Sequence, residues 1–198
     1  MTASRSLVRV SRTFLSGQMI PACRNFGIAL FCCATIMSAF LVRDPRVVSA
    51  KESVPRVQLH TDNLGPREIE DLTSKSVPRD YALAWQTMER ALAENRPGLL
   101  DGYFTGLAKQ DLTQRVNAQI KSNLRTRYQD GGHKLDGIFY SPAGDVMELR
   151  DHAKLDVEIL DGSKVVDQES LNVEYTVMMT PGADRWLVRE LQATTTKP

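Results

Sequence analysis

DVMELRDHAKLDVEILDGSKVVDQESLNVEYTVMM, residues 145–179, is the stretch whose pattern says most about the architecture of this chain. Apolar and polar residues alternate over residues 152–159, which is typical of a β-strand with one buried face. Asp161-Gly162 then supplies a position that tolerates a positive φ, and the alternation resumes over residues 171–179. The stretch therefore predicts an antiparallel hairpin with one apolar face.

Residues on either side extend this hairpin into a larger sheet. Residues 135–140 also alternate and lead into the turn Ser141-Pro142-Ala143-Gly144. Residues 186–191 follow Pro181-Gly182, which is a second turn signal. We therefore expect a curved, four-stranded antiparallel meander at the carboxyl-terminal end of the chain.

Two amphipathic helices are expected before the strands. The first covers residues 78–95, and the second runs from about residue 109 to Tyr128, with apolar residues at helical spacing in both. Because helices come first and strands last, the fold class is α+β, with the helices packed on the apolar face of the sheet. The apolar stripes consist of Tyr81, Trp85, Met88 and Leu92 in the first helix and Leu112, Val116, Ile120, Leu124 and Tyr128 in the second.

The order of these elements resembles that of the nuclear transport factor 2-like superfamily. The resemblance rests on the first helix with Asp80-Tyr81-Ala82-Leu83-Ala84-Trp85, a glycine-punctuated segment ending near Phe104, and a last strand opening with Trp186-Leu187-Val188. It covers residues 67–193 and implies a cone-shaped domain with a pocket at its open end. Members include isomerases, dehydratases, binding and dimerising modules, and membrane-tethered bacterial accessory domains, so the resemblance implies a fold rather than one activity.

The amino-terminal residues are expected to contain a membrane segment. Residues 26–42 lack charge, and a helix of that length rises about 25 Å, close to the thickness of the bilayer hydrocarbon. The basic segment 1–25 precedes it, which by the positive-inside rule places the amino terminus in the cytoplasm and the folded domain outside. Residues 43–66 are interpreted as a spacer and residues 194–198 as a tail.

The processing of this membrane segment has alternatives. Left uncleaved, residues 26–42 would make the chain a single-pass protein of the cell membrane. Val48-Ser49-Ala50 has the small residues of a signal-peptidase site, so cleavage after Ala50 would release a secreted or periplasmic domain. A mitochondrial presequence is a third interpretation, because the first 43 residues are rich in arginine and serine and lack acids. Translation from Met19 would omit the first 18 residues.

Charge and cysteine content exclude several classes of function. The first fifty residues hold six of the 25 basic residues and one of the 24 acidic residues, so the remainder has a net charge of −4. That charge does not suit nonspecific binding to nucleic acid, and we expect none. All three cysteines lie in the first fifty residues, so the predicted domain can have no disulfide or cysteine nucleophile. Metal and phosphate motifs are also missing, and we expect no metal and no cofactor.

One carboxylate and three histidines are candidates for acid–base catalysis. Asp101 is the best candidate for an acid or base, because it lies in the apolar segment 99–107 that would border the pocket; an exposed turn is the favoured alternative. His152 alternates onto the polar face of its strand. His133 is expected in an exposed loop at a strand start, and His60 belongs to the spacer.

Four aromatic residues are candidates for lining the pocket: Trp85, Tyr128, Tyr140 and Tyr175. Core packing is the alternative for each of them. Since the sequence contains no convergent polar motif, we expect a membrane-tethered extracytoplasmic module that binds a protein partner or forms a homodimer, as an accessory of an envelope protein complex. One alternative is a small-molecule isomerase, dehydratase or hydrolase that uses the cone pocket. A non-catalytic binder of an apolar ligand is another.

Overall fold

The computed structural model describes residues 54–194. The predicted basic segment 1–25 and membrane segment 26–42 lie outside these residues. Within residues 54–194, no helix has the length and apolar character needed to span a membrane. In chain order the elements are β1 (Val57–His60), α1 (Asp71–Glu94), the 3-10 helix η1 (Pro97–Gly102), α2 (Gly106–Ser122), β2 (Leu124–Tyr140), β3 (Met147–Asp161), β4 (Lys164–Pro181) and β5 (Trp186–Thr194).

The strands form one five-stranded sheet in the order β1-β2-β3-β4-β5. Strands β2 to β5 make the predicted antiparallel meander, whereas β1 pairs in parallel with β2, from Val57 opposite His133 to His60 opposite Asp136. The expected four-stranded antiparallel sheet is therefore corrected to a mixed sheet of five strands. β1 comes from the segment 43–66 interpreted as a spacer, and its four residues are too few for a clear alternation.

Helix α1 carries the aromatic stripe that the sequence predicts. It begins at Asp71, includes Pro78, and ends where Asn95 takes up a left-handed conformation with φ 54°. All four residues of the predicted stripe are at most 3% exposed. Spacings of three and four place them on one helical face, and this face is the one that packs on the sheet.

Helix α2 is shorter than expected. It ends at Ser122, because Asn123 is left-handed with φ 54°, and β2 begins at Leu124. The prediction of a helix through Tyr128 was wrong: Tyr128 lies on β2, opposite Val157 of β3. A spacing of four residues keeps side chains on one side of a strand as well as on one side of a helix, so the row from Leu124 to Tyr128 did not distinguish the two.

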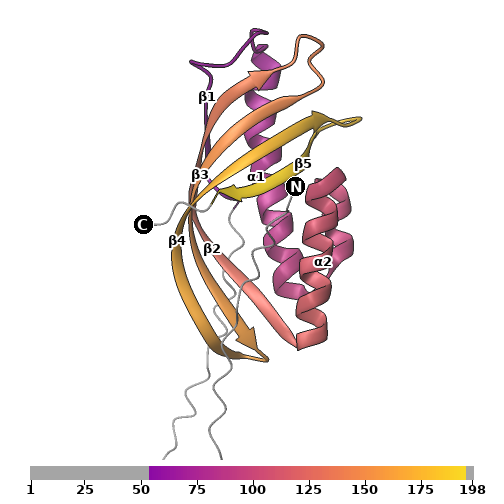
Figure 1. Ribbon diagram of the computed structural model, residues 1–198, viewed down its shortest axis with the longest axis vertical. Helices are drawn as coiled ribbons and strands as arrows, with labels where there is room; N and C mark the ends of the chain where they lie inside the picture. Colours follow the sequence, from indigo (N-terminus) through magenta and orange to yellow (C-terminus); the bar gives the residue numbers. More distant parts are fainter. Residues whose placement is uncertain (1–53, 195–198) are drawn as a thin grey trace, which may run out of the picture. The chain divides into compact units, whose positions relative to one another are not determined.

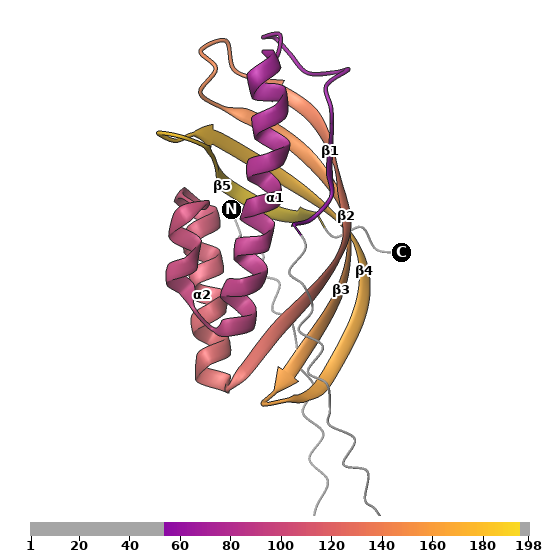
Figure 2. The same ribbon diagram turned by 180° about the vertical axis from the view of Figure 1, so that it is seen from behind.

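Both α1 and α2 lie on the same side of the curved sheet, which we call the inner face (Figure 1, and from behind in Figure 2). The α+β prediction, with helices covering one apolar face, is thereby confirmed. The opposite, outer face carries no helix of residues 54–194. The fully buried apolar strand residues of the inner face are Leu135, Met147, Leu149, Val177 and Met179.

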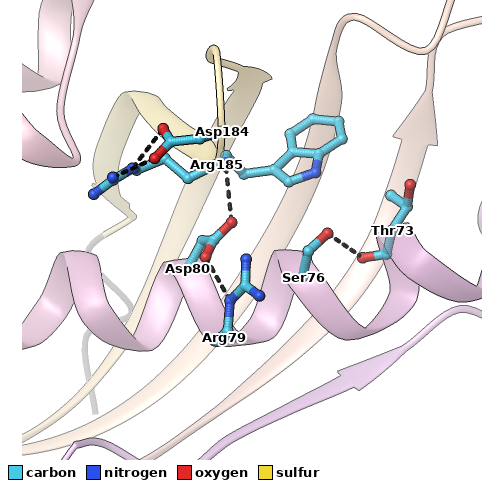
Figure 3. Close-up of polar contacts among 7 residues, drawn as sticks. Thr73, Ser76, Arg79, Asp80, Asp184 and Arg185 are labelled. Atoms are coloured by element: carbon cyan, nitrogen blue, oxygen red, sulfur yellow. Dashed lines mark hydrogen bonds and ion pairs between the residues drawn. The ribbon is translucent and has the colours of Figure 1, made fainter.

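A buried carboxylate joins α1 to the start of β5. Asp80 is 1% exposed, and its Oδ2 accepts a hydrogen bond of 2.8 Å from the backbone N–H of Trp186 (Figure 3). Its Oδ1 accepts a second hydrogen bond, from Nε of Arg79, at 2.8 Å. The neighbouring pair, Asp184 and Arg185, lies in the turn before β5. Asp80 therefore fixes the position of the first residue of β5 against the helix.

The edge of β5 that faces away from β4 is covered by the segment between η1 and α2. The N–H of Val188 donates to the carbonyl of Tyr103, and the N–H of Thr105 donates to the carbonyl of Val188, both at 2.9 Å. These bonds satisfy backbone groups that an edge strand would otherwise leave unpaired. The glycine-punctuated segment of the sequence therefore closes the sheet beside α2.

Candidate functional site

A histidine held between two carboxylates lies on the inner face of the sheet. Nε2 of His133 lies 2.6 Å from Oδ2 of Asp130, and Nδ1 lies 2.7 Å from Oδ2 of Asp151. The side chains of His133 and Asp151 are completely buried, and that of Asp130 is 8% exposed. We call these three residues, with Tyr81, the buried polar cluster.

A bulge in β2 brings Asp130 and His133 to the same face. Asp130 pairs with Leu155 and Gly132 pairs with Lys154, so Gly131 is an extra residue in the strand. The extra residue reverses the alternation, and side chains three positions apart then point in the same direction. Gly132 has φ +112°, a conformation that L-residues with a side chain rarely adopt. The Gly131-Gly132 pair is therefore what makes the cluster possible.

Asp151 comes from the middle of an apolar row on β3. It lies between Leu149 and Ala153 on the inner face, and all three residues are at most 2% exposed. Its Oδ2 also accepts a hydrogen bond of 2.8 Å from the hydroxyl of Tyr81 on α1. Its Oδ1 has no hydrogen-bond partner among residues 54–194.

Trp85 covers the cluster on the helix side. Its ring centroid lies 4.4 Å from that of His133, with the two planes inclined by 42°. Trp85 is itself 2% exposed, and its ring also contacts Tyr81 edge-on at 6.3 Å. The indole of Trp85 thus occupies the space through which a substrate would approach His133 from the helices.

Electrostatics favours a charged His133. Burial alone would lower the pKa of His133, but hydrogen bonds to Asp130 and Asp151 outweigh this effect and raise the pKa to about 9. At neutral pH both ring nitrogens therefore donate, one to each carboxylate. Burial, together with the charge of Asp151, raises the pKa of Tyr81 well above its usual value, so its phenol remains a donor. The buried polar cluster is therefore an ion network in which the charged His133 donates to two carboxylates inside the core.

The predicted pocket-lining residues divide into two groups. Trp85, Tyr128 and Tyr175 lie together beside the buried polar cluster, with ring centroids 6.5 Å apart for Trp85 and Tyr128 and 5.5 Å apart for Trp85 and Tyr175. Tyr140 lies elsewhere, 6.3 Å from the ring of Trp186, and its hydroxyl donates to Glu70 at 3.1 Å. In the first group, the rings of Tyr128 and Tyr175 each contact the ring of Trp85 edge-on, which is core packing.

The structure also places the other acid–base candidates. Asp101 lies in η1 with an exposed side chain, and it forms an ion pair of 2.9 Å with Lys109. His152 lies on the outer face, as the alternation predicted, and is half exposed beside Asp136. His60 is on β1, half exposed, with Nδ1 3.1 Å from the same carboxylate. None of these residues contacts the buried polar cluster.

The expectation that His133 is an exposed loop histidine was wrong, because the residue is buried at the centre of β2. Asp130 and Asp151 were not considered as candidates. The alternation of β3 contained a signal for Asp151, since it is the charged residue in phase with Leu149, Ala153 and Leu155. No metal-binding group of three or more His, Cys, Asp or Glu residues occurs within residues 54–194.

A groove of about 990 Å³ lies on the outer face of the sheet, behind the bulge. Its floor includes Gly131 and Gly132, and its walls carry the outward side chains of β1 to β4. The charged or histidine residues that line this outer groove and alternate onto the outer face are Arg56, Lys134, His152, Lys154 and Glu174; His133 and Glu169 also border the groove, but they are in register with the inner face. The polar amide and hydroxyl side chains are those of Gln58, Ser170 and Asn172.

Comparison with known proteins supports the fold. No protein-family model and no curated protein sequence matches the chain. Among solved structures, the intermembrane space region of the chloroplast protein ARC6 is similar over 66% of this chain and 100% of that chain, with 12% identity and a TM-score of 0.56. The likeness concerns the fold alone. With the observed layers, it supports an α+β fold in which helices cover one face of a curved sheet.

Two other solved structures resemble this chain less closely in fold. One is a protein from Streptomyces avermitilis that is named as a putative dehydratase of the NTF2-like family. The similarity covers 63% of this chain and 99% of that chain, with 12% identity and a TM-score of 0.44. The other is a protein with a cystatin-like fold from Nostoc punctiforme. The similarity covers 67% of this chain and 98% of that chain, with 13% identity and a TM-score of 0.39.

Proposed function

We propose that this chain is a membrane-tethered, extracytoplasmic binding module that docks a protein partner through the outer face of its sheet, as an accessory of an envelope protein complex. The membrane contact is through residues 26–42, and the folded domain lies on the extracytoplasmic side. A tether raises the effective concentration of the domain at the membrane surface, so a modest interface is sufficient for function.

The observation that carries this proposal is the location of the hollow surface. The outer groove holds about 990 Å³ and is lined by exposed polar groups, including Lys134 and His152. In contrast, His133 and Asp151 have no exposed side-chain atoms. This location supports docking through the outer face, because His133 and Asp151 on the inner face are sealed in the core.

Site-specific photocrosslinking in native membranes tests this assignment. A photoreactive amino acid at Gln58, which lines the outer groove, is expected to give one discrete crosslinked protein band. The matched control is the same amino acid at Leu107 on α2, which is 53% exposed and on the other side of the sheet. Equal crosslinking from both positions, or none from Gln58, would contradict docking through the outer face.

Two further measurements test the tether. Alkaline carbonate extraction is expected to leave the chain in the membrane pellet, and protease added outside spheroplasts is expected to digest the folded domain. Release of a species that begins after Ala50 would show instead that the amino-terminal segment is cleaved. Protection of the domain in intact spheroplasts would contradict its extracytoplasmic location.

The second candidate function is acid–base catalysis at the buried polar cluster. A histidine between two carboxylates is an arrangement that general acid–base catalysis uses, and this observation favours an isomerase or dehydratase. We rank it second because a catalytic His133 must contact substrate, and Trp85 covers its ring. Diethylpyrocarbonate should modify His60 and His152 in the folded protein but leave His133 unmodified. Rapid modification of His133 would favour the enzyme.

A further inference from the structure

Three basic side chains surround the glycine bulge on the floor of the outer groove. Gly132 pairs with Lys154 of β3 on one side, and on the other side Arg56 precedes β1, with its carbonyl accepting the N–H of His133 at 2.9 Å. Lys134 lies two residues beyond Gly132, on the same face of β2. We call Arg56, Lys134 and Lys154 the cation triad.

The cation triad has no counter-ions of its own within residues 54–194. All three side chains are exposed, and none of them forms an ion pair or a side-chain hydrogen bond with another described residue. The nearby acid Glu174 is already paired with Arg150, at 3.5 Å, and with His152, at 3.7 Å. Exposed cations around a hollow produce a local positive potential on a domain whose net charge is negative.

The bulge gives a ligand access to these cations. A side chain at position 132 would project from the floor between Arg56 and Lys154, and its Cβ would meet only the carbonyl oxygen of Arg56, at 3.5 Å. Glycine leaves this space open. The backbone of the sheet is therefore exposed between the charged side chains, and an extended chain can lie across it.

We propose, as a refinement of the proposed function, that the outer groove binds an acidic, extended segment of a partner protein, with carboxylates paired to the cation triad. Strands lie about 4.8 Å apart, so Arg56 and Lys154, two strands apart, are separated by about 10 Å at their backbones. An extended chain covers that distance in about three residues. A short run of glutamate or aspartate side chains therefore matches the spacing.

Other occupants fit the groove less well. A single phosphate group carries a charge of about −1.5 to −2, so it neutralises the three cations less completely than a run of three carboxylates does. An anionic bilayer presents a flat surface of headgroups, whereas the three cations line a groove. A second copy of this face would bring its own three cations against the triad, and its outward acid Glu174 is already paired with Arg150 and His152. The imbalance of charge in the groove favours an acidic partner segment.

The test uses the full-length chain in uncharged detergent and fluorescein-labelled hexaglutamate as the probe. Fluorescence anisotropy is expected to show binding that weakens as sodium chloride rises from about 50 to about 200 mM, because ion pairs at a surface are screened. The double variant K134E/K154E is expected to weaken binding at least tenfold. The matched control K121E/K164E changes the same charge at exposed sites outside the groove and should change affinity less than twofold.

The folding of each variant is checked by circular dichroism and by its urea midpoint, so that loss of structure is not counted as loss of binding. Absence of hexaglutamate binding, or equal weakening in both double variants, would overturn the proposal. Displacement of hexaglutamate by millimolar inorganic phosphate at constant ionic strength would also overturn it. Triad-dependent binding to phosphatidylglycerol vesicles, or a dimer that K134E/K154E dissociates, would assign the groove to a different occupant.

This inference and the proposed function fail separately. If crosslinking from Gln58 captures a partner and K134E/K154E leaves that crosslink unchanged, the outer face is the docking surface but the acidic segment is wrong. If neither crosslinking nor hexaglutamate binding is seen, both are wrong. Loss of the crosslink in K134E/K154E, with retention in K121E/K164E, supports both.

Discussion

His133 and Asp151 form an ion pair across two neighbouring strands, with a distance of 2.7 Å between Nδ1 and Oδ2 and no exposed side-chain atom in either residue. A pair this deeply buried is stable only if its hydrogen-bonding groups are satisfied. Asp130 accepts from Nε2 and Tyr81 donates to Oδ2 of Asp151, which leaves Oδ1 of Asp151 as the one atom of this pair without a hydrogen-bond partner among residues 54–194. The stability of the domain should therefore depend strongly on His133.

We expect His133→Ala to lower the free energy of unfolding by about 3–5 kcal/mol, because it leaves two carboxylates in the core without their cation. Urea denaturation followed by circular dichroism measures the change. His152→Ala is the matched control, since His152 is half exposed on the outer face of the adjacent strand, and it should change stability little. Similar losses in the two variants would show that His133 and its carboxylates do not form a stabilising ion network.

The stability of the domain should also depend on pH through His133. The pKa of His133 is about 9 in the folded chain, against 6.5 as its ordinary value. Because the folded state binds the proton more tightly, the contribution is fully present below about pH 6.5 and is lost as the pH rises through 9, by up to about 3 kcal/mol.

Urea unfolding of the wild-type chain at pH 6 and pH 9.5 measures this loss. His133→Gln, which does not titrate, is expected to show a smaller change between the same two pH values. The difference between the two proteins isolates the histidine from every other titrating group. If the wild-type chain instead gained stability from pH 6 to pH 9.5 relative to His133→Gln, His133 would be neutral in the folded chain.

Asp80→Ala tests the connection between α1 and β5. The substitution leaves the buried N–H of Trp186 without its acceptor, so we expect a loss of about 2–3 kcal/mol in the free energy of unfolding. Asp184→Ala removes an exposed carboxylate from the turn shown in Figure 3 and should leave the urea midpoint unchanged. Intrinsic tryptophan fluorescence should report the change at Trp186.

Gly132→Ala tests the bulge. At φ +112° an alanine is strained, and the expected loss is about 1–3 kcal/mol, even though its Cβ has space. Gly98→Ala is the control, because no atom lies within 4 Å of the added Cβ and the φ of Gly98 is not positive. Thermal unfolding of the two variants measures the contrast, and an unchanged melting temperature for Gly132→Ala would indicate a different backbone conformation at the bulge.

The sequence predicted the elements whose periodicity is long and uninterrupted. The aromatic stripe of α1 extends over several helical turns, and the alternation of β3 and β4 extends over several residue pairs, so the sequence alone assigns their buried faces. β1 was missed because four residues contain too little pattern, and because its partner on β2 is remote in the sequence. The start of β2 was missed because an apolar spacing of four also fits a helix.

The sequence did not predict the buried polar cluster because the bulge changes the face on which His133 lies. Before Gly131 the inner residues of β2 are Tyr128 and Asp130, and after it they are His133 and Leu135, so a strict period of two places His133 on the wrong face. No local rule reveals how far the extra residue shifts the strand. Asp151, in contrast, lies in phase with its apolar neighbours and could have been identified from β3 alone.

The hydrogen bonds that Val188 donates to Tyr103 and accepts from Thr105 link the segment before α2 to β5. Neither element can separate from the other without exposing main-chain amides on both, so α2 and β5 should open together as one cooperative unit in native-state hydrogen exchange. Because β5 is synthesised after the other described elements, α2 should gain this protection during folding only once β5 is available.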